Sequence, residues 1–209
     1  NSLFTIMTEQ DPVHKQVMKA TAQTLAEHGF AGFTMRTVAE QIDASKSTLQ
    51  YRYDSKEGLL ATWLEHNTST QAERFEQYAD QPPLERLVGI LDENLRLIEN
   101  PAIDGLLPAY LELHTRAPRT DAFRAVLSEA ERQYQSELVD CIEDGIEQGV
   151  FRPVDPEATA TLLIAAPDSA ALTQHTLGDD AVVSRLRTAL NELVFQSLLV
   201  EDVKLEELL

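Results

Sequence analysis

Apolar residues recur at intervals of three and four along most of this 209-residue chain, and this spacing places them on one face of an α-helix. The clearest set is Leu84, Leu87, Val88, Leu91, Leu95 and Ile98. Glycines and prolines cluster where the periodicity stops, as at Pro82-Pro83 and Asn100-Pro101, because both residue types interrupt helices. The sequence therefore predicts an all-α protein.

Residues 34–56 contain two short helical segments separated by a break. Thr34 precedes an apolar set at helical spacing: Met35, Val38, Ala39 and Ile42. Its hydroxyl can cap that first helix by accepting a backbone N–H. Asp43-Ala44 breaks the pattern, and Ser45 can cap the second helix. Two helices joined by a turn of this length form a helix-turn-helix unit, whose second helix enters the DNA major groove.

The second of these helices is rich in groups suited to DNA. Its early residues are Lys46, Ser47, Thr48, Gln50, Tyr51 and Arg52. Lys and Arg pair with guanine edges or phosphates, Gln pairs with adenine, and the Thr methyl contacts the thymine methyl. On the pattern alone, an ordinary helical hairpin with a solvated polar face remains an alternative.

Residues 14–64 resemble the DNA-binding domain of the TetR family of transcriptional regulators. The resemblance is carried by an ordered set of motifs: Leu25-Ala26-Glu27-His28-Gly29-Phe30, Gly32-Phe33-Thr34, Val38-Ala39, Ser45-Lys46-Ser47-Thr48-Leu49, Tyr51-Arg52-Tyr53 and Ser55-Lys56-Glu57-Gly58-Leu59-Leu60. The chain departs from the family pattern at Asp43, Ser47, Gln50 and Tyr53. Gln50 stands where an aromatic residue is common, so we expect an altered base preference and an intact fold.

The resemblance implies a double-stranded DNA operator as partner and a set of contact residues. We expect base-edge or phosphate contacts from Arg36, Lys46, Gln50 and Arg52, with Ser47 beside them at the start of the second helix. Phosphate anchors that set the register are expected at Thr34, Thr37, Ser45, Thr48, Tyr51 and Lys56.

The charge is unevenly distributed. The chain has a formal net charge of −18, from 17 basic and 35 acidic residues. Residues 1–66 hold six Lys and Arg against eight Asp and Glu, a net charge of −2, so −16 falls on the other 143 residues. The acidity therefore does not argue against DNA binding by the N-terminal part. Excess carboxylate with only five lysines leads us to hypothesise a halophilic source, with an acidic mesophile protein as the alternative.

Several functional classes find little support in the sequence. No run of 18 apolar residues and no signal-peptide pattern occurs, and the single cysteine, Cys141, excludes an internal disulfide framework. We therefore expect a cytoplasmic protein without a membrane partner. The five histidines form no metal-ligand pattern, and no nucleophile elbow or phosphate loop is present. We expect neither an enzyme nor a cofactor. Two alternatives stay open: a helical protein-interaction regulator without sequence-specific DNA binding, and an all-helical enzyme.

The predicted organisation has four parts. Residues 1–12 are expected to be a disordered lead or a cloning remnant, and residues 202–209 an acidic tail. Residues 13–60 form the helix-turn-helix domain, and residues 61–201 form a helical regulatory and dimerisation domain. Within the latter, helices are predicted over 63–78, 84–98, 103–114, 123–149, 157–177, with a kink at Pro167, and 180–200.

The resemblance implies a small-molecule site among the middle helices. Candidate lining residues are Trp63, Tyr78, Leu91, Leu95, Leu107, Tyr110, Leu111, His114, Phe123, Leu127 and Tyr134, and for any single one ordinary core packing is the alternative. Tyr110 and His114 stand at i and i+4, so they share a helix face. Glu112 and Arg116 have the same spacing, for which a solvated ion pair is expected.

The resemblance also implies a homodimer through the last two helices, which are more apolar than a lone surface pair. A fully buried helix within a monomer is the alternative. The expected interface residues are Leu162, Ala166, Ala170, Val183, Leu186, Leu190, Leu193 and Val194. An effector between the middle helices would shift the helix around 63–78 and so move the two DNA-binding domains away from operator spacing.

Overall fold

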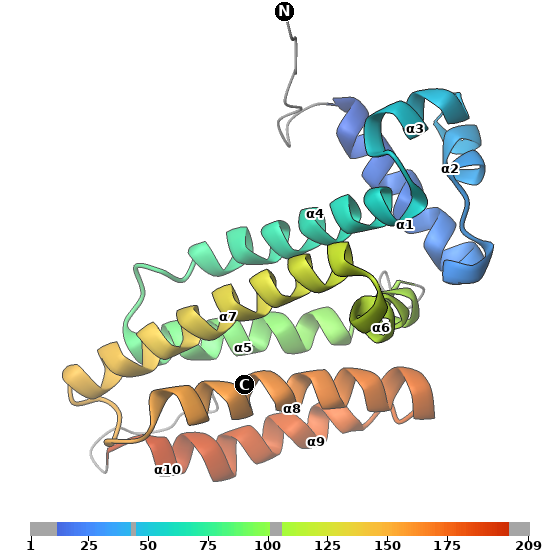
Figure 1. Cartoon of the computed structure of the whole chain (residues 1–209). Coiled ribbons are helices and arrows are strands. Elements are labelled where there is room, and N and C mark those ends of the chain that lie inside the picture. The colour runs from blue at the N-terminus through green and yellow to red at the C-terminus, as the bar shows by residue number, and fades with distance from the viewer. Residues whose placement is uncertain (1–11, 43–44, 101–105, 201–209) are drawn as a thin grey trace, which may run out of the picture. The chain divides into compact units, whose positions relative to one another are not determined.

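A computed structural model describes residues 12–42, 45–100 and 106–200, and in these ranges the chain forms helices joined by turns and loops (Figure 1). The only β-type backbone contact among the described residues is an isolated antiparallel bridge between Phe151 and Leu199. The predicted all-α class is confirmed. The predicted tail, the lead before residue 12 and the turn at Asp43-Ala44 lie outside the described residues.

The chain divides into two compact units. The head unit consists of residues 1–70 and 105–128, and the second unit of residues 71–104 and 129–209. This division differs from the predicted boundary at residue 60. Two long helices, α4 (Lys56–Glu76) and α7 (Asp121–Glu147), each contribute to both units.

The head unit is built around α1 (Pro12–Gly32), α2 (Met35–Gln41) and α3 (Lys46–Tyr53). It also contains the first part of α4, α6 (Leu107–Arg116), the short 3-10 turn η2 (Ala117–Arg119) and the start of α7. A continuous apolar core joins these elements, including Val17, Leu25, Phe33, Val38, Leu49, Leu59, Leu113 and Phe123. The helix-turn-helix therefore shares its core with α6 and α7.

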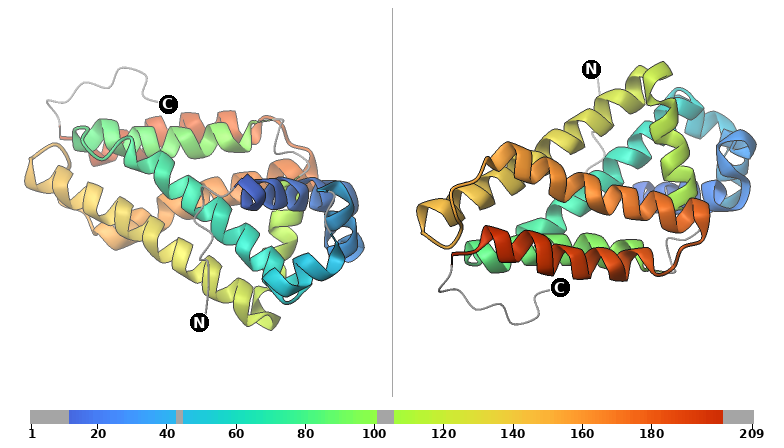
Figure 2. Two further views of the ribbon diagram at one scale, coloured as in Figure 1. Left: turned by 90° about the horizontal axis from the view of Figure 1, so that it is seen from above. Right: turned by 90° about the horizontal axis from the view of Figure 1, so that it is seen from below.

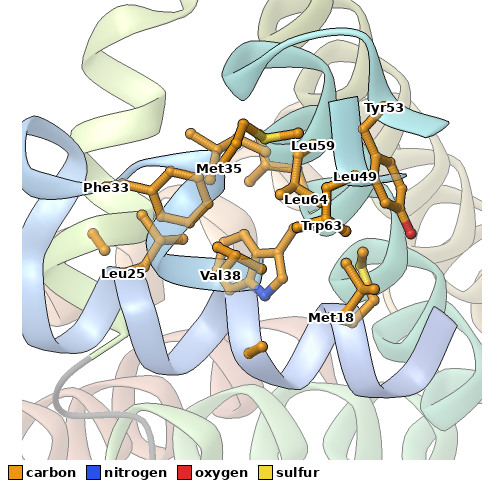
Figure 3. Packing of buried hydrophobic residues seen from close by; sticks show 14 of the residues in the cluster. Met18, Leu25, Phe33, Met35, Val38, Leu49, Tyr53, Leu59, Trp63 and Leu64 are labelled. Carbon is orange, nitrogen blue, oxygen red and sulfur yellow. The ribbon is translucent and has the colours of Figure 1, made fainter. Parts of the chain in front are cut away.

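Trp63 belongs to this core. Figure 3 shows its indole among Val38, Leu49 and Leu64, and only 3% of the residue is exposed. We predicted Trp63 as a lining residue of an effector pocket. In the structure Trp63 packs in a core that also contains residues of α2, α3 and α4, and its role toward an effector stays a prediction.

The second unit contains α5 (Pro83–Ile98), α8 (Pro156–Leu177), α9 (Val182–Ala189) and α10 (Gln196–Leu198). In Figure 2, α8 and α9 lie side by side, and these two helices are in extensive contact. Ion pairs tie α9 to α5, since Arg187 bonds Asp92 at 2.5 Å and Glu99 at 2.9 Å. Arg86 of α5 likewise bonds Glu137 of α7.

Local sequence features determine where α8 begins and where it ends. Asp155 caps it by accepting the Ala158 N–H at 3.0 Å, and it ends at Gly178, where φ is +67°. Glycine is favoured at this left-handed position. The helix runs without interruption through Pro167, where the sequence predicts a kink.

The predicted helix over 180–200 is not uniform. Between α9 and α10 the chain forms a π-helical turn, η3 (Leu190–Phe195). In an α-helix, residues five apart point about 140° away from each other. A π-turn holds more residues and brings them toward one side. Leu190 and Phe195 can both be buried here, at 2% and 0% exposure, because the backbone departs from the α-helix.

Candidate nucleic-acid interface

Both helices of the helix-turn-helix begin at side-chain caps. Thr34 Oγ1 accepts the Thr37 N–H at 3.1 Å, and Thr37 Oγ1 accepts the Thr34 N–H at 3.2 Å. Ser45 Oγ accepts the Thr48 N–H at 3.1 Å and lies 2.8 Å from the Thr48 hydroxyl. The Thr34 and Thr37 bonds are reciprocal, and all of these backbone bonds satisfy N–H groups that have no partner within their helices. The predicted caps at Thr34 and Ser45 are confirmed.

α3 has one buried face and one exposed face. Leu49 and Tyr53 are buried, at 2% and 9% exposure. The predicted contact residues Ser47, Thr48, Gln50, Tyr51 and Arg52 are all exposed. Tyr51 is 91% exposed, the highest value among the large hydrophobic side chains described. Lys46 is the first residue of the helix. An outward row of polar and aromatic groups on a short helix suits insertion into a major groove.

The remaining two predicted DNA contacts differ in their surroundings. Arg36 is exposed and pairs with Glu40, with Nε and Oε1 at 2.8 Å. The hydrogen bond that the Arg36 guanidinium donates to Glu40 raises the pKa of the guanidinium, so this group stays charged. Lys56 is turned into the protein: its Nζ donates to the Phe30 carbonyl and lies 3.9 Å from the centroid of the Phe30 ring. This internal placement argues against the predicted phosphate contact of Lys56.

A sharp turn connects α3 to α4. Asp54 has φ +58° and ψ −51°, and the Ser55 N–H donates to the Tyr53 carbonyl at 2.6 Å. This is a γ-turn of the strained hand. Ser55 Oγ then accepts the Gly58 N–H at 3.0 Å and caps α4. A Cβ at Gly58 would lie 2.2 Å from the Tyr53 carbonyl oxygen, so only glycine fits here. The turn fixes the direction of α3 relative to the start of α4.

The predicted pocket residues are divided between the two units. Trp63, Leu107, Tyr110, Leu111, His114, Phe123 and Leu127 belong to the head unit, whereas Tyr78, Leu91, Leu95 and Tyr134 belong to the second unit. Leu91, Leu95 and Phe123 are fully buried and serve as core. The rings of Tyr110 and His114 lie 4.5 Å apart, as their spacing predicts. Burial lowers the pKa of His114 and favours its neutral form.

A polar chain around Tyr134 was not predicted. Gln71 Nε2 donates to Asn94 Oδ1 at 2.8 Å, and Asn94 Nδ2 donates to the Tyr134 hydroxyl at 2.7 Å. Phe75 stacks on the Tyr134 ring, with centroids 5.2 Å apart. The available sequence signal was Asn94, an uncharged polar residue directly before the core residue Leu95 on the amphipathic helix α5.

The predicted dimer residues are not equally available. Ala170, Val183 and Leu190 are buried within the protomer, so their side chains are already covered without a partner. Ala166, Leu186 and Val194 are half-buried. Leu162 and Leu193 are 53% and 70% exposed, and the structure adds Leu172 and Leu177, at 48% and 77%. Leu172 and Leu177, which the sequence analysis did not propose, are exposed residues near the C-terminal end of α8.

Two further properties concern the chain over residues 12–42, 45–100 and 106–200. No cluster of His, Cys, Asp or Glu there could hold a metal ion. No helix in those ranges is both long and apolar enough to cross a membrane.

A capped helix-turn-helix that presents an exposed second helix, joined to a larger helical region, defines a helix-turn-helix transcriptional regulator. The chain belongs to the TetR family of bacterial regulatory proteins. The family model of the DNA-binding domain matches residues 17–62, and the model of the BetI-type transcriptional repressor C-terminal domain matches residues 83–199. The matched family consists of regulators, not enzymes.

Relatives of known sequence are also transcriptional regulators. The chain is 25% identical over 162 residues to the regulator YhgD of Bacillus subtilis, covering 72% of this chain and 78% of that protein. It is 25% identical over 140 residues to the repressor KstR2 of Mycobacterium tuberculosis, covering 66% and 68%.

Solved structures share the fold. A TetR regulator from Haloarcula marismortui is 30% identical with a TM-score of 0.81, covering 88% of this chain and 97% of that one. A transcriptional regulator from Saccharomonospora viridis in complex with choline is 22% identical with a TM-score of 0.79, covering 92% and 100%. At 22% identity, the Saccharomonospora viridis regulator is similar to this chain in fold alone.

Proposed function

We propose that this protein is a ligand-responsive repressor that binds a pseudo-palindromic operator as a homodimer and is released by a small apolar or amphipathic effector. The observation that carries the proposal is the outward row on α3, from Ser47 to Arg52, held by the Ser45 cap and the turn at Asp54. Base edges are read by Gln50, Arg52 and Arg36. Thr34, Thr37 and Tyr51 anchor phosphates.

Exposed leucines on the last helices support the homodimer. Leu162, Leu172 and Leu193 would each leave water on association, and apolar burial is the main favourable term in such contacts. A dimer carries two α3 helices and reads two half-sites one helical turn apart. Binding of the second half-site is then intramolecular, which strengthens operator binding without new contacts.

A carboxylate in the second unit supports an effector that carries a positive charge. Asp168 is solvent-accessible and has no hydrogen bond or ion pair with another described residue. Burial by surrounding protein raises the pKa of Asp168 to about 6, and the charge of Glu131 acts in the same direction. The charge of Asp168 also acts on Tyr134, which Phe75 stacks against. An organic cation beside Asp168 would stabilise the charged form of this carboxylate, and cations of this kind are also attracted to the faces of aromatic rings. The choline held by the Saccharomonospora viridis regulator belongs to this chemical class.

The test is selection of bound DNA from a random library in molar KCl. The control is an Arg36→Ala/Tyr51→Ala double variant, which alters two exposed side chains and spares the core. Enrichment of a pseudo-palindromic motif by the wild-type protein, lost in the control, is the expected result. A protein that enriches no motif contradicts the proposal and favours a protein-interaction regulator. In vitro transcription from the enriched operator then distinguishes repression from activation.

A further inference from the structure

The segment of the head unit that carries the proposed DNA contacts has no net charge. Residues 34–55 include α2 and α3, and three basic residues there stand against three acidic ones. These residues are Arg36, Lys46 and Arg52, and Glu40, Asp43 and Asp54. A surface that binds DNA by neutralising phosphates carries an excess of Lys and Arg. The balance of charge in this segment therefore calls for a different mode of binding.

Lys56, the next cation along the chain, does not alter this balance. Its Nζ donates to the Phe30 carbonyl and lies 3.9 Å from the centroid of the Phe30 ring. Burial lowers the pKa of Lys56. The ammonium group is thus directed into the head unit.

Arg36 is paired with Glu40 on an exposed face of α2. Arg36 Nε donates to Glu40 Oε1 at 2.8 Å, and the two side chains are 78% and 60% exposed. In a helix-turn-helix protein the first helix crosses the DNA backbone. A phosphate that approaches this face of α2 would therefore meet a carboxylate beside the guanidinium.

The stability of α2 gives a poor explanation for this pair. Arg36 stands in the first turn of the helix and Glu40 in the last. The helix dipole favours acidic groups at the N-terminus and cations at the C-terminus. At a spacing of four residues, the acidic residue is also better placed ahead of the basic one. The pair has the less favourable order in both respects, so we looked for its role in DNA binding.

Uncharged groups dominate the exposed contact residues of this segment. Hydroxyls and one amide are presented to solvent by Thr34, Ser45, Ser47, Thr48, Gln50 and Tyr51. Such groups hydrogen-bond phosphate oxygens and base edges. Affinity falls with salt because cations on the protein displace counterions from phosphates. Contacts made by uncharged groups lack this term, and they lose less affinity as salt rises.

We propose that Glu40 offsets the charge of Arg36 at the DNA-facing surface, so that the operator is bound chiefly through uncharged hydrogen-bonding groups and stays bound in concentrated salt. Glu40 is a positioning residue, since it acts through Arg36. The inference rests on the proposed function. It also fits the net charge of −18, because salt screens the repulsion between an acidic protein and DNA.

The test is the slope of the logarithm of operator affinity against the logarithm of KCl concentration. Glu40→Gln preserves the shape of the side chain and removes its charge. The matched control is Glu129→Gln, which removes an exposed carboxylate that is paired with Arg132 in the second unit. An Arg36→Gln/Glu40→Gln double variant removes both charges and so keeps the segment neutral.

The wild-type dimer and the Glu129→Gln control should give a slope no steeper than about −4, whereas ten phosphate contacts would give about −9. Glu40→Gln adds one net positive charge to each head unit, so its slope should be steeper by about 2. Between about 50 and 200 mM KCl this variant should lose roughly tenfold more affinity than the wild type. The two affinities should converge in molar KCl, where the screening length is about 3 Å.

The double variant separates charge from structure. Its affinity should fall at every KCl concentration, because Arg36 is a proposed contact, but its slope should match that of the wild type. Equal slopes for the wild type and Glu40→Gln would overturn the inference, and so would a wild-type slope near about −9.

Duplex DNA of random sequence tests the role of Glu40 without an operator. Non-specific binding is almost entirely electrostatic. Glu40→Gln should therefore bind this DNA at least about tenfold more tightly than the wild type at about 50 mM KCl, and Glu129→Gln should not. Equal affinities of the wild type and Glu40→Gln would overturn the inference. Failure of the wild-type protein to enrich any operator would instead overturn the proposed function.

Discussion

Glu112 accepts the backbone N–H of Phe30 at 3.1 Å and thereby joins α6 to the end of α1. The sequence predicts Glu112 only as the partner of Arg116 in a solvated ion pair, and that pair is present at 2.8 Å. The additional bond gives the pair a structural role. It links the segment that leads into the helix-turn-helix to a helix that lies some 80 residues later in the sequence.

Gly58→Ala should destabilise the protein strongly. A Cβ would lie 2.2 Å from the Tyr53 carbonyl oxygen, which belongs to the backbone and cannot move away as a side chain could. We expect a loss of about 2–3 kcal/mol in unfolding free energy, the scale of an overpacked core site. Urea denaturation measures it. The comparison is Gly178→Ala, where a Cβ meets nothing and only the positive φ of +67° opposes the change, so about 1 kcal/mol is expected. Equal losses in the two variants would contradict the contact.

Tyr51→Ala should leave stability within about 0.5 kcal/mol of the wild-type value, as expected for an exposed surface position, because the side chain is 91% exposed. Operator affinity should fall across all half-site sequences, since Tyr51 is proposed to contact phosphate. Fluorescence anisotropy with labelled operator measures this effect.

Gln50→Ala should change the preferred half-site sequence instead. An amide side chain reads adenine through two hydrogen bonds, and alanine makes neither. Repeating the DNA selection with this variant gives the altered motif. A motif identical to that of the wild-type protein would show that Gln50 does not read a base.

Asp168→Asn should stabilise the free protein at neutral pH. The folded pKa of Asp168 is raised to about 6 by burial, whereas an unfolded aspartate titrates near 3.9. A raised folded pKa means that stability is fully present below about pH 4 and decreases as pH rises through 6. Because Asp168 is accessible to solvent, screening reduces the gain to about 1 kcal/mol. Thermal melts at pH 4 and pH 7.5 should differ between variant and wild type only at the higher pH. Asp121→Asn, at an exposed ion pair with Arg124, is the control and should not reproduce this pH dependence.

Salt should raise thermal stability markedly. With a net charge of −18, repulsion opposes the compact state, and added ions screen it. We expect the melting temperature to increase steadily from low salt to molar KCl. Sucrose at matching osmolality separates screening from preferential exclusion, because sucrose carries no charge. A melting temperature indifferent to KCl would remove the argument for a halophilic source.

Leu193→Asp should weaken the proposed homodimer without unfolding the protomer. Leu193 is 70% exposed in the isolated chain, so a carboxylate there is hydrated in the monomer and becomes unfavourable only when a partner covers it. Sedimentation velocity should show a dimer for the wild-type protein and a shift toward monomer for the variant. Val13→Asp, at an apolar position on α1 that is 46% exposed, should remain dimeric. A variant Leu193→Asp that sediments like the wild type would place the interface elsewhere.

The sequence alone determined the features that depend on neighbours a few residues apart. The caps at Thr34 and Ser45 were recognisable because a hydroxyl reaches a backbone N–H only three positions ahead. The end of α8 at Gly178 and the start of α5 at Pro83 follow equally local rules. The Tyr110 and His114 contact also required nothing beyond helical spacing.

Only the tertiary structure decided which helix faces which. Trp63, Lys56 and Glu112 have ordinary helical surroundings in sequence, yet one fills the core of the head unit and the other two hold Phe30. The burial of Ala170 and Val183, and the π-turn that brings Leu190 and Phe195 to one side, likewise depend on packing between elements. Periodicity shows that a helix has an apolar face, but the partner of that face is set by side-chain shape and by long-range contacts that local spacing does not encode.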